Sequence, residues 1–141
     1  MSGETTNIRL KKMINYGFTK EIDASFEETL DKVSNELNKE GFGILTQINI
    51  AEKFKEKLGI DFKKYIILGA CNPPSAHKAI LAEENIGLLL PCNVVIYERQ
   101  NKTVVSIIKP KVAMKLIGNV ELEQIASTIE KKLKKVFDSI I

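Results

Sequence analysis

Two segments rich in β-branched residues, 93–99 and 103–109, lie on either side of the tripeptide Gln-Asn-Lys. This spacing is typical of a β-hairpin, because strands of this composition joined by a short polar connection favour a tight reversal. A hairpin supplies at least one antiparallel strand pair. The sheet of this protein is therefore predicted to be antiparallel or mixed.

The clearest helical pattern covers residues 25–41, where apolar residues recur at helical spacing. This stripe consists of Phe26, Leu30, Val33 and Leu37. Ser25 and Glu28 predict a capping box at its start, and Gly41 suits the left-handed conformation that ends a helix. A C-terminal helix is predicted from about Asn119 to Ile140, with the buried stripe Leu122, Ile125, Ile129, Leu133, Val136 and Ile140.

Three further strands are predicted before the hairpin. Residues 16–22 place Tyr16, Phe18 and Ile22 on one face at period two, although Lys20 interrupts that face. Residues 44–50 alternate in the manner of a half-buried strand. Residues 65–71 form a continuous apolar run, which is typical of a central strand covered on both faces.

Shorter helices are predicted between these strands. Asn49 is expected to cap one of them. Its inward positions and its end are predicted to be Ala51, Phe54, Leu58 and Gly59. Asn72 is expected to cap the next, with Pro73 at the first helical position and an end near Glu84, because proline needs no amide partner there. Residues 110–119 predict an irregular turn or a short helix.

This order of elements predicts an α+β fold of two layers, in which helices pack on one face of a small mixed or antiparallel sheet. One β-hairpin precedes the C-terminal helix. Residues 1–14 are polar and without periodicity, and we expect a loosely ordered N-terminal arm there. Residues 15–141 are predicted to form a single α/β domain, since 141 residues contain no repeat and no linker.

Composition narrows the classes of function. The net charge is only +3, from 21 basic and 18 acidic residues, and Trp is absent, so no nucleic-acid partner is predicted. The longest apolar run, residues 86–97, is about half the length of a membrane span and is interrupted by Pro91 and Asn93. The start resembles no secretory signal. We therefore expect a cytoplasmic protein with no membrane partner and with reduced cysteines.

The stretch CNPPSAHKAI, which begins at Cys71, concentrates the rare chemistry of the chain. Cys71 is expected between the end of a strand and the N-terminus of a helix, where free amides stabilise a thiolate. The alternative is an inert buried cysteine that fills space. His77, the only histidine, is a candidate general base or metal ligand, or a solvated side chain.

A second block, Leu-Leu-Pro-Cys-Asn, contributes Cys92. Together Cys71, His77 and Cys92 would supply three metal ligands and leave one position open, although their spacing matches no zinc signature. The two thiols meet at one edge of the sheet only if their strands are antiparallel neighbours. Asn72 and Asn93 follow the two cysteines and are candidate ligand-binding amides, with helix capping as the structural alternative for Asn72.

Several segments resemble the blocks of the domain-of-unknown-function 302 (DUF302) family, from about residue 16 to residue 135. They are DASFEETL, EGFGILTQINI, KEKLGIDFKKYIILGACNPPSAHKAI, IGLLLPCNVVIYE and TVVSIIKP. The resemblance implies a compact two-layer fold and a homodimer, and it implies no settled activity. By motif position, the family's recurring residues are Cys71, Asn72, Pro73, His77, Pro91, Cys92 and Asn93.

Three hypotheses about function follow. The leading one is a homodimeric binding module that holds a small ligand or a metal near Cys71, His77 and Cys92, because pockets form at strand–helix junctions. The second is a thiol-dependent redox or transfer enzyme with Cys71 as nucleophile, His77 as base and Cys92 as resolving thiol. It predicts an accessible Cys71 with a lowered pKa. The third is a structural or interaction protein without a chemical site. No particular ligand, cofactor or substrate is predicted.

Overall fold

The computed structural model describes residues 14–141. Its elements are β1 (Gly17–Ile22), α2 (Phe26–Lys39), β2 (Gly43–Asn49), α3 (Ile50–Leu58), β3 (Tyr65–Cys71), α4 (Pro73–Ala82), the 3₁₀ helix η1 (Glu84–Leu89), β4 (Cys92–Arg99), β5 (Lys102–Ile108), α5 (Pro110–Met114), the 3₁₀ helix η2 (Lys115–Ile117) and α6 (Val120–Ser139). The arm predicted for residues 1–14 lies outside the described residues except for Ile14. The domain boundary therefore stays a prediction.

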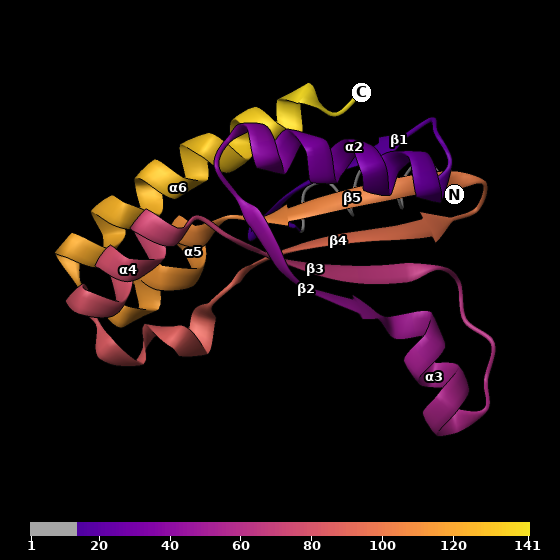
Figure 1. The fold of residues 1–141 in the computed structure, drawn as a ribbon, viewed down its shortest axis with the longest axis horizontal. Coiled ribbons are helices and arrows are strands. Elements are labelled where there is room, and N and C mark those ends of the chain that lie inside the picture. Colours follow the sequence, from indigo (N-terminus) through magenta and orange to yellow (C-terminus); the bar gives the residue numbers. More distant parts are fainter. Residues whose placement is uncertain (1–13) are drawn as a thin grey trace.

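The five strands form one sheet in the order β1-β5-β4-β3-β2, and every neighbouring pair is antiparallel. The predicted hairpin is confirmed, because β4 and β5 pair directly across Gln100 and Asn101. Helices α2 and α6 lie on the same side of the sheet, as Figure 1 shows. The predicted two-layer α+β architecture is thus confirmed.

Local capping chemistry fixes where the helices begin. The Ser25 hydroxyl accepts a hydrogen bond from the backbone amide of Glu28 at 3.0 Å, and the Glu28 carboxylate accepts one from the amide of Ser25 at 3.2 Å. This is the predicted capping box, which satisfies two amides that a helix start otherwise leaves unpaired. Gly41 follows α2 with φ at 83°, a left-handed value that favours glycine.

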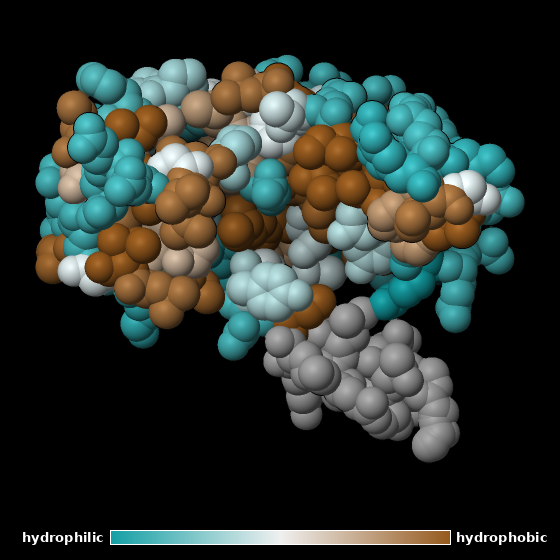
Figure 2. All heavy atoms as spheres, turned by 90° about the horizontal axis from the view of Figure 1, so that it is seen from below, coloured by the Kyte–Doolittle hydropathy of each residue, from teal (hydrophilic) through white to brown (hydrophobic). Residues whose placement is uncertain are grey.

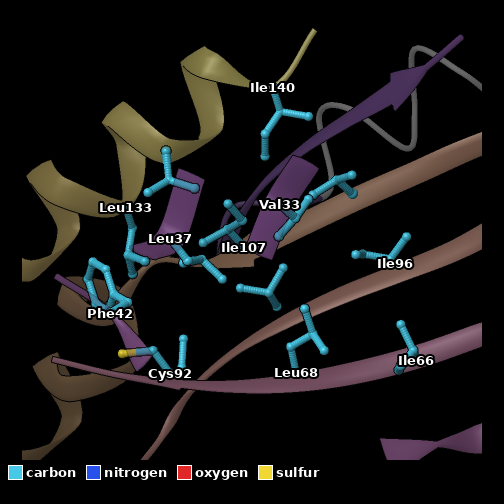
Figure 3. Close-up of a cluster of buried hydrophobic side chains, with 14 of the residues drawn as sticks. Val33, Leu37, Phe42, Ile66, Leu68, Cys92, Ile96, Ile107, Leu133 and Ile140 are labelled. Carbon is cyan, nitrogen blue, oxygen red and sulfur yellow. The ribbon is translucent and has the colours of Figure 1, made fainter. Parts of the chain in front are cut away.

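The main core lies between the sheet and the two long helices. The apolar stripes of α2 and α6 pack against inward residues of the central strands, as Figure 3 shows. Its most deeply buried side chains include Val33, Leu37, Phe42, Leu68, Val94, Ile96, Ile107 and Leu133. A smaller cluster of Ala79, Ile86, Met114, Leu122 and Ala126 joins α4, η1 and α5 to the N-terminal half of α6. No helix within residues 14–141 is long and apolar enough to cross a membrane.

Helix α3 differs from its prediction. It begins after Asn49 and ends at Gly59 as expected, but none of its residues is buried, and Leu58 is 64% exposed. In Figure 1 it projects from the end of β2, away from the other helices. The periodicity of Ala51, Phe54 and Leu58 correctly indicated an apolar face. The prediction that this face is buried is wrong, because Ala51 and Phe54 are only half-buried, with the Phe54 ring 5.0 Å from that of Phe62, and Leu58 is exposed.

Candidate functional site

The junction between β3 and α4 is held by Asn72, which is only 7% exposed. Its side-chain oxygen accepts a hydrogen bond from the amide of Ser75 at 3.3 Å, the geometry of an N-cap. Its side-chain nitrogen donates to the carbonyl oxygen of Gly41 at 3.2 Å. The amide of Asn72 therefore joins the start of α4 to the end of α2, which accounts for this residue without a ligand.

The two cysteines lie on neighbouring antiparallel strands, β3 and β4, as a shared site requires. Their side chains nevertheless point to opposite faces. Cys92 pairs with Ala70, one residue before Cys71, and side chains alternate between the two faces along a strand. Antiparallel direction thus brings the strand ends together, while the register separates the thiols.

Cys92 belongs to the core. It is 6% exposed and packs in the same cluster as Phe42 and Leu68, as Figure 3 shows. Burial raises the pKa of the Cys92 thiol to about 11, with a smaller contribution from the nearby Cys71. A thiol in this environment stays protonated at neutral pH, so Cys92 is poorly suited to act as a resolving thiol.

Cys71 is half-buried on the opposite face. Burial raises the pKa of the Cys71 thiol above its ordinary value, whereas a nucleophilic role requires a lowered pKa. This direction runs against the thiol-enzyme hypothesis.

The remaining candidates do not converge on Cys71. His77 is exposed on α4, two residues before the buried Ala79 and so on the opposite side of that helix. Asn93 is exposed on the sheet face opposite α2, across from Gly69. Among residues 14–141, no group of three or more His, Cys, Asp or Glu side chains is placed to hold a metal ion. The arrangement therefore gives the metal alternative no support.

Next to Cys71, the sheet surface is closed by side chains that approach Gly69. A Cβ atom at position 69 would lie 2.7 Å from Cγ of Pro91 and would collide with the hydroxyl of Thr46. Only glycine allows these two side chains to meet over β3. Gly69 is visible in the sequence of β3, but the need for glycine there can be explained only once the pairing of β3 with its neighbours is known.

A cavity of about 320 Å³ lies elsewhere, where β1 meets the last turn of α6. Its lining includes the cations Lys20, Arg99 and Lys109 and the aromatic rings of Phe18 and Phe137. None of these residues was predicted to be functional. One available signal was Lys20, which breaks the apolar period of β1.

A second surface that the sequence did not define is the sheet face opposite α2 and α6, here called the open face. The cross-strand pairs Tyr65–Tyr97 and Ile67–Val95 point to it. Ile48 of the edge strand β2 pairs with Ile67 and extends this apolar row, with 42% of its own surface exposed. The view of Figure 2, towards β2 and α3, shows apolar side chains interspersed with hydrophilic ones.

Comparisons with known proteins agree with this fold. The model of the family described as "Domain of unknown function DUF302" matches residues 18–140. A crystal structure of an uncharacterized conserved protein DUF302 from Bacillus stearothermophilus superimposes with a TM-score of 0.84 at 31% sequence identity, covering 90% of this chain and 99% of that one. No curated protein matches the chain. The family match spans most of the sequence, and the chain therefore belongs to the DUF302 family.

Proposed function

We propose that this protein is a homodimeric binding module whose two copies meet through the open face of the sheet. The observation that carries the proposal is the apolar character of β3 and β4 on both of their faces. Ile66, Leu68, Val94 and Ile96 point to the helices, whereas Tyr65, Ile67, Val95 and Tyr97 point away from them. An antiparallel sheet that faces water normally alternates apolar with polar residues.

The chemistry of the open face suits a second copy of the same chain. Along β3 and β4 its side chains are apolar, aromatic or uncharged polar, and Arg99 is the one charged residue among them. Because Arg99 donates to the carboxylate of Glu21 at 2.6 Å, that charge is partly compensated. Two further cations lie at the rim, since Lys102 pairs with Arg99 and the Lys63 ammonium lies 4.7 Å from the centre of the Tyr97 ring. The uncharged centre of the face can meet itself in a two-fold dimer without like-charge repulsion.

The size of the face is adequate. Five strands spaced about 4.8 Å apart, each some seven residues long, present roughly 500 Å² of flat area. Side-chain relief and the projecting α3 add to this, so the contact reaches the order of the ~800 Å² that each partner buries in a standard interface. Leu58, Ile60 and Phe62 are 64%, 45% and 44% exposed around the end of α3 and would extend the contact.

The other functional hypotheses receive less support. The thiol-enzyme hypothesis requires Cys71, His77 and Cys92 to cooperate, but they lie on different faces and both thiols have raised pKa values. A small ligand near Cys71 stays a prediction, as does the cytoplasmic location. The open face therefore carries the proposal in place of the thiols.

The test is the mass of the protein in solution. We expect light scattering after gel filtration to give twice the 15.8 kDa of one chain. Ile48→Lys, on the exposed edge of the face, should yield monomers, because a buried ammonium without a partner is strongly unfavourable in an interface. Circular dichroism checks that this variant is folded.

The matched control is Leu116→Lys, in η2, where Leu116 is 92% exposed. It introduces the same charge at an exposed apolar residue that lies outside the sheet, and the dimer should persist. A monomeric wild-type protein at about 100 μM would contradict the proposal, since obligate interfaces of this size hold well below that concentration. Dissociation by Leu116→Lys with an intact Ile48→Lys dimer would place the interface elsewhere.

A further inference from the structure

Lys20 occupies an unusual position for a cation. It pairs with the fully buried Val105 and shares the helix-covered face of β1 with Phe18 and Ile22. Its ammonium donates to the carbonyl oxygen of Phe137 at 2.6 Å and lies 4.4 Å from the centre of the Phe137 ring. Burial lowers the pKa of Lys20, and the neighbouring Asp138 opposes that shift. One of the three ammonium donors is thus used at the end of α6, and two remain.

The cavity beside Lys20 combines positive charge with aromatic walls. Phe18 and Phe137 pack with ring centres 5.6 Å apart, and the Lys109 ammonium lies 4.9 Å from the Phe18 ring. Within residues 14–141, neither Lys20 nor Lys109 has a carboxylate within salt-bridge distance.

The remaining charges of the lining cancel each other. Glu21 is the one carboxylate among the described lining residues, and its Oε2 is 2.6 Å from the guanidinium of Arg99. Among residues 14–141, the cavity therefore presents two lysines that form no salt bridge, next to the half-buried rings of Phe18 and Phe137. Its volume of about 320 Å³ falls at the lower end of the range for small-molecule sites, roughly 300–1,000 Å³.

We propose that this cavity binds a small organic carboxylate with an apolar or aromatic body. The carboxylate lies between Lys20 and Lys109, because hydrogen bonds between ionised partners are stronger than those between neutral groups. The apolar body of the ligand lies against Phe18 and Phe137. A compact divalent anion such as free phosphate fits less well, because half of the lining residues are apolar and would not be contacted by it. Arg99 and Val104 of the lining belong to the open face, but Lys20, Phe18 and Phe137 lie on the helix-covered side of β1. Probe binding by a monomeric protein would therefore separate the failure of the dimer from the failure of this site.

The probe is 2-naphthoate, with the uncharged 2-naphthamide as its isosteric match, titrated into the full chain by calorimetry. We expect naphthoate to bind about tenfold more tightly than naphthamide, the difference expected for one charge-assisted hydrogen bond. Raising the salt concentration should narrow this difference, because an accessible ion pair is screened. Backbone amide signals of Thr19 and Val104, which line the cavity, should shift on titration.

The decisive variant is Lys109→Gln, because within residues 14–141 the Lys109 side chain makes no hydrogen bond and its backbone bonds to Tyr16 and Val112 are kept, whereas the Lys20 side chain holds the end of α6. It should reduce naphthoate affinity about tenfold and leave naphthamide affinity unchanged. Lys115→Gln, an equal loss of charge on the exposed η2, should change neither. Equal binding of the two probes, no saturable binding, or an equal effect of Lys115→Gln would overturn the proposal.

Discussion

Asn72 provides the sharpest test of whether the junction after β3 serves the fold or a ligand. If its amide serves only the fold, Asn72→Ala removes two interactions at once. The N-cap of α4 is worth about 1 kcal/mol, and the hydrogen bond to the Gly41 carbonyl about another 1 kcal/mol. The free energy of unfolding should therefore fall by about 2 kcal/mol, which lowers Tm by roughly 6–10 °C in a chain of this length.

Two further variants separate these contributions. Asn72→Ser retains a good N-cap oxygen but lacks the amide donor, so it should lose only about 1 kcal/mol. Asn49→Ala is the matched control, because Asn49 caps α3 through the amide of Glu52 at 3.0 Å, yet α3 buries none of its residues. A cap on a helix without tertiary packing frays locally, and we expect less than about 0.5 kcal/mol there.

Urea unfolding followed by circular dichroism measures all three variants, at one protein concentration because dimerisation couples to stability. An Asn72→Ala variant as stable as the wild type would contradict the structural role, since Asn72 would then be free to serve a ligand. Equal destabilisation by Asn49→Ala and Asn72→Ala would contradict it as well. In that case capping alone, and not the bond that ties α4 to Gly41, would set the effect.

Three other predictions concern the same region of β3 and β4. Gly69→Ala should lower the free energy of unfolding by about 1–3 kcal/mol through overpacking, and Thr46→Ala in the same chain should restore part of it, as urea titrations would show. Iodoacetamide should label Cys71 more slowly than a free cysteine at pH 8, and rapid labelling at neutral pH would contradict its raised pKa. Because the folded pKa of Cys92 is about 11, against 9.0 for an unperturbed thiol, the unfolded chain ionises first and stability should fall from about pH 9 to pH 11. Cys92→Ala should flatten that decline, whatever its effect on stability at pH 7.

Local chemistry explains which parts of the fold could be predicted. The Ser25–Glu28 capping box, the Asn49 and Asn72 caps and the hairpin at residues 100–101 all depend on residues a few positions apart. Such contacts form within one short segment, so the sequence of that segment is enough to predict them. Asn119 makes a local contact of the same kind, because its side-chain oxygen accepts a hydrogen bond from the amide of Leu122 and caps α6. Its side-chain nitrogen also donates to the carbonyl oxygen of Ala82, so Asn119 joins α4 to α6 as Asn72 joins α2 to α4.

Partnership between distant segments could not be predicted in the same way. The apolar face of α3 is as regular as that of α2, but periodicity does not state whether another layer exists to cover it. Lys20 is a second example. The reason for a cation in this apolar strand is its hydrogen bond to Phe137 at the end of α6, which the sequence of β1 does not reveal. For Lys20, the deciding contact joins residues 117 positions apart in the sequence.

Strand register decides whether the two cysteines can form one site. The strands that end at Cys71 and begin at Cys92 are antiparallel, as a site shared by the two thiols requires. Direction, however, is only half of the condition, because two side chains share a face only when the register places them opposite one another. Here Cys92 stands opposite Ala70, so one residue of offset sends Cys92 into the core and Cys71 to the open face. That register is set by packing along the whole sheet, and it converts an apparent pair of reactive thiols into one core residue and one residue at the edge of an apolar surface.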